Sequence, residues 1–416
     1  MKKILFILYT CCILLFPVSA QQIPSFKAND RIVFLGNSIT EGGHYHSYIW
    51  LYYMTHFPEL PLRIYNGGIG GDCASHMVFR FDSDIKIKKP TYLVCSFGMN
   101  DSGYDGYNKP GYDKYANKQV EYANTEFGKL QQQILADKKI KNVVLLGSSP
   151  YDENVKLEGV ETLHGKNETI KRIIEMQAEV AQKRGWGFVN FNTVMCELNK
   201  EIQQSDSTAT FCGGDRIHPD KDGHMVMAYL FLKAQGLAGK EVAYFHINAT
   251  NRKAMEERNC RITHIKNEND TISFSYLSRS LPFPVDTIPR WGTKGTARDA
   301  VRQVPFMQEM NQEIMKVTDL HGNFRVTIDG TEIGRWDGNE LSKGINLAEI
   351  TCTPQYQQSL SIMYLNEERC AIEKRLRQYM AMQYVFFKHR GLLFADNKAA
   401  LDAAKAERES HYLVKY

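Results

Sequence analysis

The serine in FLGNSITEGG, residues 34–43, lies between a strand-like run and a helix-like run. Residues 31–35 are rich in β-branched and aromatic side chains, as in a buried strand. The apolar segment at residues 46–57 is typical of a buried helix. Ser38 therefore falls where a helix begins, and the backbone N–H groups there favour a developing negative charge on a nucleophile. The same place suits a serine that only caps the helix, so this segment alone leaves both roles open.

A second group of reactive side chains lies in CGGDRIHPDKDGH, residues 212–224. Asp215 and His218 are three residues apart, so one turn of chain can place the carboxylate against the imidazole. A histidine held in this way keeps one tautomer, and its other ring nitrogen can accept a proton from a serine. Pro219 suits the first position of the next helix, and we expect His224, one turn inside that helix, to pack in the core. A surface Asp–His pair is the alternative.

Two further loops carry groups that could bind an oxyanion. Residues 66–72 contain four glycines, which let backbone N–H groups approach a ligand closely. A dinucleotide-binding fingerprint would need another glycine where the chain has Cys73, so that alternative is weak. Asn100 could donate its side-chain N–H to an oxyanion, or it could cap the next segment. The chain has neither a C-x-x-C pair nor an H-E-x-x-H segment, so we expect no metal site and no cofactor.

The elements that must position these loops alternate between residues 30 and 235. Alternating strand-like and helix-like segments indicate βαβ units, which form a parallel sheet with helices on both faces. Ligands bind such sheets beyond the carboxyl ends of the strands, where all four loops are expected. We expect strands at 32–35, 62–65, 92–97, 142–147 and 187–191, and helices at 47–56, 74–87, 117–136, 168–184 and 221–235.

The pattern changes past residue 240. Residues 260–284 predict two strands around a polar turn, and the Asp329-Gly330 pair predicts a hairpin. We therefore expect the first domain at 21–245 and a C-terminal α+β region at 246–416, with no internal repeat.

The end of the C-terminal region is predicted to be helical from about residue 359. Its apolar residues recur at helical spacing, and the alanine-rich, charged segment 395–410 predicts an exposed helix. The apolar stripe consists of Ile372, Leu376, Tyr379 and Met380.

Composition excludes several classes of protein. Of the 416 residues, 43% are hydrophobic and 24% are charged, as in ordinary globular proteins. The net charge of +4 is too small to indicate a nucleic-acid partner. Seven of the cysteines follow residue 20, and this odd number argues against a full disulfide framework, although one or two bridges stay open. The oligomeric state is left open.

The first twenty residues have the pattern of a signal peptide. MKK is a basic start, ILFILYTCCILLF is an apolar run, and VSA precedes QQ as a small-residue cleavage site. We therefore expect residues 1–20 to be removed by cleavage after Ala20. The apolar run is short for a membrane span, so we expect a periplasmic or secreted protein without stable membrane insertion.

Four segments together resemble the conserved blocks of the SGNH (GDSL-type) hydrolase family. GNSIT, the glycine loop ending in GGD, GMND and DRIHP occur in the family's order and at roughly its spacing. Each is weak alone, but four in order are specific, and they cover about residues 30–235. The resemblance implies a flavodoxin-like three-layer α/β/α domain with a parallel sheet, here followed by the C-terminal α+β region.

The resemblance also implies roles for individual residues. Ser38 would be the nucleophile, His218 the general base and then acid, and Asp215 the residue that orients the imidazole. The oxyanion hole would comprise the backbone N–H groups of Ser38 and Gly71 and the side-chain amide of Asn100. These groups would converge on the point where a carbonyl oxygen becomes negative.

One residue departs from the family pattern. The usual aspartate before the serine is Asn37 here. An amide keeps an acceptor oxygen but loses the charge, so the local loop geometry is expected to differ. Asn37 is not the proton acceptor, and activity is therefore still expected.

The expected function is that of a serine esterase, most simply an O-acetylesterase acting on a polysaccharide or oligosaccharide. The partner would be an acylated carbohydrate or a small ester. A lysophospholipase or thioesterase is an alternative on the same fold, and a non-catalytic glycan-binding module is an alternative of another class. Tyr104, Tyr107 and Tyr112 could stack on sugars or could pack within the protein.

Overall fold

The computed structural model of the chain describes residues 22–269, 271–289, 294–395 and 398–408. The predicted signal peptide, residues 1–20, lies outside these residues. Within the described ranges, no helix has both the length and the apolar character needed to cross a membrane. All seven cysteines of these ranges are free thiols, so the bridges left open by the sequence are not formed.

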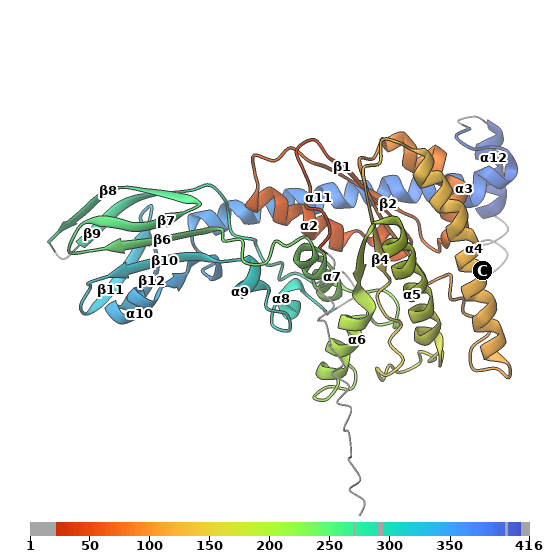
Figure 1. Cartoon of the computed structure of the whole chain (residues 1–416), viewed down its shortest axis with the longest axis horizontal. Coiled ribbons are helices and arrows are strands. Elements are labelled where there is room, and N and C mark those ends of the chain that lie inside the picture. Colours follow the sequence, from red (N-terminus) through yellow and green to blue (C-terminus); the bar gives the residue numbers. More distant parts are fainter. Residues whose placement is uncertain (1–21, 270, 290–293, 396–397, 409–416) are drawn as a thin grey trace, which may run out of the picture.

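A five-stranded parallel sheet organises the first half of the chain (Figure 1). Its strand order is β2-β1-β3-β4-β5, and every neighbouring pair is parallel. This is the flavodoxin-like order, and it confirms the predicted fold class. The strands are β1 (Arg31–Gly36), β2 (Arg63–Gly68), β3 (Tyr92–Phe97), β4 (Asn142–Gly147) and β5 (Gly187–Asn190).

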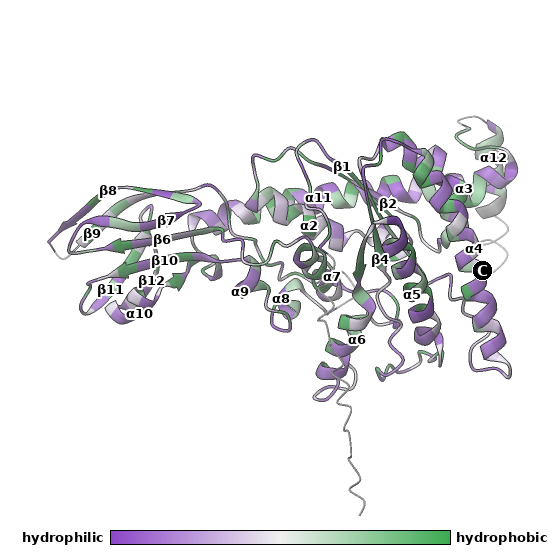
Figure 2. Ribbon diagram, viewed as in Figure 1, coloured by the Kyte–Doolittle hydropathy of each residue, from purple (hydrophilic) through white to green (hydrophobic). Residues whose placement is uncertain are grey.

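Helices cover both faces of this sheet and bury two separate cores. Successive side chains of a strand point to opposite faces, so Phe34 lies in one core and Leu35 in the other. Figure 2 shows the hydrophobic strands between helices of mixed polarity. One face carries α2 (His44–His56), α6 (Phe191–Ile202) and α7 (Lys221–Ala234), and the other carries α3 (Ala74–Arg80), α4 (Tyr112–Ala136) and α5 (Lys166–Arg184).

Helix α6 is not among the predicted helices, and its first residue, Phe191, falls at the end of the predicted strand 187–191. Asn190 is the N-cap of this helix, and its side chain accepts a hydrogen bond from the Thr193 N–H at 3.2 Å. The chain therefore turns from strand to helix without a loop. Both elements are apolar at this junction, so periodicity alone could not separate them.

The C-terminal region begins with a β-rich lobe at one end of the molecule (Figure 1). Its central sheet has the order β13-β10-β6-β7, and both predicted hairpins are present beside it. Phe245, Ile247 and Met315 lie in the core that these elements share. The strands of the lobe are β6 (Ala243–Asn248), β7 (Lys253–Arg258), β8 (Cys260–Glu268), β9 (Thr271–Ser278), β10 (Glu313–Thr318), β11 (Asn323–Ile328), β12 (Thr331–Asp337) and β13 (Ile345–Asn346), and its helix is α10 (Gly338–Lys343). The short helices α8 (Ala297–Ala300) and α9 (Phe306–Met310) instead pack in the same core as α7.

A long helix, α11 (Pro354–Ala381), runs from this lobe along the α/β domain, and α12 (Lys398–Arg408) follows it (Figure 1). The prediction of a helix here is confirmed, but the apolar stripe is not its buried face. Asn366 and Arg377 are buried instead, because α11 packs on backbone and polar groups of β2 and α2. Three residues of the stripe are exposed: Ile372 (58%), Leu376 (61%) and Tyr379 (53%).

A buried glutamate in the β-rich lobe makes stability depend on pH. Burial raises the pKa of Glu313 to about 7, although the Tyr276 hydroxyl donates to its carboxylate at 2.7 Å. The unfolded chain has the ordinary pKa of 4.5. The folded state therefore binds more protons between these two values, and stability falls as pH rises through that window, by on the order of 3 kcal/mol.

We expect Glu313→Gln to remove this loss, so that the variant is more stable than wild type at pH 8 but not at pH 4. Urea unfolding midpoints at both pH values measure the effect. Glu268→Gln is the control, because Glu268 is exposed in the same lobe. Equal pH dependence in Glu313→Gln and wild type would contradict the assignment.

Candidate active site

Ser38 is the first residue of the short helix α1 (Ser38–Gly42), directly beyond the carboxyl end of β1. The N-cap of α1 is Asn37, whose side-chain oxygen accepts a hydrogen bond from the Ile39 N–H at 3.0 Å. Asn37, and not Ser38, therefore caps the helix. An amide and a carboxylate both have an acceptor oxygen, so asparagine can cap the helix as the family's usual aspartate could. The Ser38 hydroxyl instead lies 2.8 Å from Nε2 of His218.

His218 is held on its other side by Asp215. The distance from His218 Nδ1 to Asp215 Oδ2 is 2.5 Å, while Asp215 Oδ1 accepts from the N–H groups of Ile217 and His218. Burial alone would raise the pKa of Asp215, but the hydrogen bonds from the His218 ring and from these N–H groups outweigh it and lower the pKa. An ionised Asp215 keeps the proton on Nδ1, so Nε2 accepts from Ser38.

The loop between these two residues is fixed by Arg216. Its backbone has φ of +70°, and its buried guanidinium donates to the carbonyls of Asp152, Val155 and Val160. This anchoring turns Asp215 and His218 to the same side. Both side chains are accessible, with 50% of Asp215 and 43% of His218 exposed.

Helix α7 begins at Lys221, as predicted, but Pro219 is not its first residue. Its N-cap is Asp220, whose carbonyl accepts from the His224 N–H at 2.9 Å, so Pro219 precedes the helix and does not open it. His224 is buried, and its ring is parallel to that of Tyr45 with the centroids 5.9 Å apart. The prediction that His224 packs in the core is confirmed.

The glycine loop after β2 lies between Ser38 and Asn100. A Cβ on Gly70 would be 4.0 Å from Ser38 Cβ, so the loop passes directly beside the serine. Gly71 has φ of +78°, which favours glycine and turns the chain toward Asp72. The Asn100 amide nitrogen donates to the Asp72 carbonyl at 3.0 Å. The structure therefore brings together the loops of all the predicted site residues.

Tyr104 orients the Asn100 amide, a role that the sequence did not reveal. Its hydroxyl donates to Asn100 Oδ1 at 2.7 Å, so the amide nitrogen faces the glycine loop. The Lys166 ammonium lies 3.8 Å from the centre of the Tyr104 ring and donates to Met99, Ser102 and Gly103. Burial lowers the pKa of Lys166 to about 7.

The other two tyrosines differ in their surroundings. Tyr107 is 2% exposed and donates to the Ser102 carbonyl at 2.7 Å, so it packs within the protein and cannot stack on a sugar. Tyr112 is 42% exposed on α4. The three tyrosines therefore do not form one sugar-binding surface.

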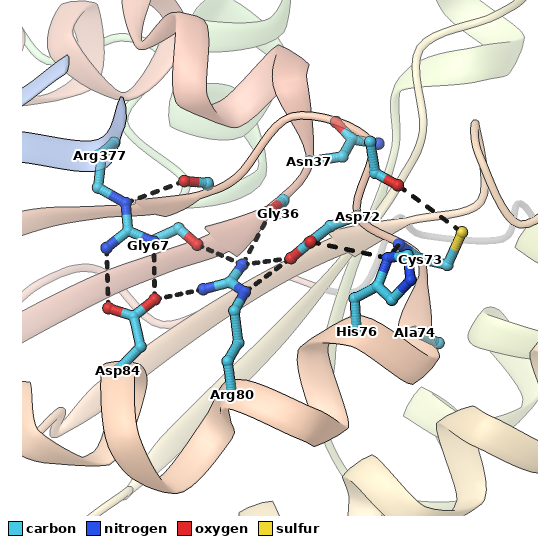
Figure 3. Close-up of polar contacts among 12 residues, drawn as sticks. Gly36, Asn37, Gly67, Asp72, Cys73, Ala74, His76, Arg80, Asp84 and Arg377 are labelled. Carbon is cyan, nitrogen blue, oxygen red and sulfur yellow. Dashed lines mark hydrogen bonds and ion pairs between the residues drawn. The ribbon is translucent and has the colours of Figure 1, made fainter. Parts of the chain in front are cut away.

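The buried guanidinium of Arg80 connects the segments that carry the site residues (Figure 3). Arg80 donates to Asp72, Asp84 and the carbonyls of Gly36 and Gly67. Gly36 lies two residues before Ser38, and Asp72 directly follows Gly71. Arg80 and Asp84 have the helical spacing i, i+4, but nothing in the sequence shows that they point inward.

Among the described residues, no cluster of three or more histidine, cysteine or acidic side chains could hold a metal ion. The site is built from a hydroxyl, an imidazole, a carboxylate and amide N–H groups. These are the groups that nucleophilic acyl transfer requires.

Comparison with known proteins identifies two matching families. Residues 34–226 match the GDSL-like Lipase/Acylhydrolase family, and residues 360–416 match the Diltiazem deacetylase C-terminal helical domain. The structure is similar to that of a gut microbial diltiazem-metabolizing enzyme, with a TM-score of 0.92 and 49% identity over 95% of this chain and 89% of that one. An acetylxylan esterase of Geobacillus stearothermophilus is 22% identical over 224 residues, which are 50% of this chain and 95% of the esterase.

The glycine before the Asp215–His218 loop provides a test of its geometry. Gly213 has φ of +72°, and a Cβ there would lie 1.9 Å from the His218 carbonyl oxygen. We expect Gly213→Ala to displace His218, to cost at least about 1–2 kcal/mol from the left-handed backbone, and to lower turnover of p-nitrophenyl acetate.

Gly214→Ala is the matched control, because a Cβ at Gly214 meets nothing within 4 Å. Thermal unfolding and kcat/KM measure both variants. Equal activity of the two variants would show that the position of this loop is not critical.

Proposed function

The chain belongs to the GDSL-like lipase/acylhydrolase family and is a carboxylic ester hydrolase, and we propose that it acts through Ser38, His218 and Asp215 by an acyl-enzyme mechanism. The observation that carries this proposal is the continuous hydrogen-bonded series of these three side chains. Its two distances are 2.8 Å from Ser38 to His218 and 2.5 Å from His218 to Asp215.

In the first half of the reaction, His218 Nε2 accepts the Ser38 proton while Oγ attacks the ester carbonyl. Asp215 stabilises the imidazolium that forms. His218 then donates the proton to the departing alcohol, leaving an acyl ester on Ser38. In the second half, His218 takes a proton from water, the hydroxide attacks the acyl-enzyme, and the Ser38 oxygen leaves with the proton that His218 returns.

The negative oxygen of each tetrahedral intermediate would be bound by three donors. The Ser38 and Gly71 N–H groups belong to adjacent loops, and the Asn100 amide lies beside them. An amide nitrogen has two hydrogens, so Asn100 can bind the Asp72 carbonyl with one and the oxyanion with the other. Tyr104 supports this arrangement by donating to Asn100 Oδ1.

Two substitutions test these roles. We expect Ser38→Ala to lower kcat for p-nitrophenyl acetate by at least about 10⁴-fold, because the nucleophile is lost. Asn100→Ala should lower kcat by about 100- to 1,000-fold with little change in KM, because an oxyanion donor acts mainly in the transition state. Thermal unfolding checks that both variants fold. Full activity of either folded variant would remove that residue from the mechanism.

For the substrate, we propose an acetyl ester, most simply on a saccharide. Two of the matches have names that concern acetyl groups: the acetylxylan esterase, and the domain family named Diltiazem deacetylase C-terminal helical domain. The half-exposed Asp215 and His218 and the exposed Gly70 and Gly71 support a site open to an ester on a bulky carrier. Diltiazem is a second candidate, favoured by the relative that is 49% identical.

A substrate panel distinguishes these candidates from the lysophospholipase or thioesterase alternatives. We expect kcat/KM for p-nitrophenyl acetate to exceed that for p-nitrophenyl octanoate at least tenfold. Release of acetate from acetylated xylo-oligosaccharides and from diltiazem then ranks the two carriers. A preference for the octanoyl ester would contradict the acetyl assignment.

We also propose that the protein is exported to the periplasm or beyond. The support is the basic start, the apolar run and the small residues before Gln21. We expect protein from the periplasm or medium of a bacterial host to begin at Gln21, as intact-mass measurement would show. An uncleaved cytoplasmic product in such a host would contradict the proposal.

A further inference from the structure

Helix α11 of the C-terminal region lies along the β2 edge of the catalytic sheet. Strand β2 is the edge strand, so its outer backbone groups lack a partner strand. Glu373 accepts from the Asn66 N–H at 2.7 Å, and Arg377 Nε donates to the Gly68 carbonyl at 2.9 Å. Four residues of helix and two residues of strand both span about 6 Å, so the two side chains match two successive outward-facing residues of β2, Asn66 and Gly68.

Arg377 also joins the buried charge cluster beneath the site (Figure 3). Its two terminal nitrogens donate to both oxygens of Asp84, at 2.8 and 2.7 Å, and Asp84 binds Arg80, which binds Asp72. The side chains of Arg377, Asp84 and Arg80 are at most 3% exposed. Burial would raise the pKa of Asp84, but its partners Arg377, Arg80 and Lys88 lower it.

This cluster reaches each segment that carries an oxyanion donor. Arg377 holds Gly68, three residues before Gly71, while Arg80 binds the carbonyl of Gly36, two residues before Ser38. The backbone of Asp72, whose carboxylate binds Arg80, accepts from the Asn100 amide. A shift of Gly68 or Asp72 would therefore move the donors relative to Ser38.

We propose that Arg377 is a positioning residue for the oxyanion hole, supplied by the C-terminal region to a site built on the other domain. Arg377 acts through Gly68 and Asp84 and does not touch the reacting atoms. This inference rests on the proposed function, because it takes Gly71 and Asn100 as oxyanion donors. Misplacing such donors weakens binding of the transition state more than binding of the ester.

Two variants of Arg377 test this role. Arg377→Met keeps an apolar stem but loses every donor, and Arg377→Lys keeps the charge but cannot bind Asp84 and Gly68 together. We expect each to lower kcat for p-nitrophenyl acetate by about 10- to 100-fold with KM changed less than about threefold. The lysine variant keeps Asp84 paired and so remains informative if the methionine variant does not fold.

Asn366→Ala is the matched control, since Asn366 is another buried α11 residue and its side chain binds Ser47 on α2, away from the oxyanion loops. We expect it to lower the melting temperature but not kcat. If Arg377→Lys and Asn366→Ala have the same kcat as wild type, the positioning role is wrong.

Ser38→Ala, measured in parallel, separates the two proposals. An inactive Ser38→Ala together with fully active Arg377 variants would overturn only the positioning role. An active Ser38→Ala would overturn the proposed mechanism itself. An inactive Ser38→Ala with a selective loss of kcat in the Arg377 variants supports both.

Discussion

The geometry of the site depends on the hydrogen bonds and ion pairs of the buried Arg80 guanidinium. A charge that is removed from water must be fully paired and hydrogen-bonded, and Arg80 meets this requirement with two carboxylates and two backbone carbonyls. Those partners come from the ends of β1 and β2, the loop after β2 and the π-helical turn Phe81–Ile85 that continues α3. The hydrogen bonds of Arg80 thus fix the relative positions of these segments. The sheet alone would fix the strands but not the loops that follow them.

Most of the α/β fold could be predicted because its physical signal is local. The expected strands at 92–97 and 142–147 coincide with β3 and β4, since parallel strands buried on both faces are continuous apolar runs. The spacing of Asp215 and His218 likewise predicted their contact, because one turn of chain places them together. The contact of His218 with Ser38, 180 residues away, was predicted from the resemblance to the SGNH family. The rule that loops after parallel strands share one edge was not sufficient, because α6 separates the His218 loop from β5.

The remainder could not be predicted because it depends on contacts between distant segments. The sequence around Tyr104 does not show that its hydroxyl donates to Asn100, because that contact depends on how the loop folds. The stripe at Ile372, Leu376 and Tyr379 predicted a helix but not the face that it buries. The buried face includes Arg377, because the edge of β2 beneath α11 offers backbone groups for hydrogen bonds. In the same way, Asn37 could be recognised as a helix cap only once α1 was seen to begin at Ser38.

The separation of 309 residues between Gly68 and Arg377 has a consequence for biosynthesis. As the chain leaves the ribosome, all five strands of the catalytic sheet emerge well before α11. Until that helix docks, the outer edge of β2 presents free backbone groups, which are a template for pairing with a second nascent chain. A helix synthesised after the whole sheet is therefore the element that protects its open edge against such association.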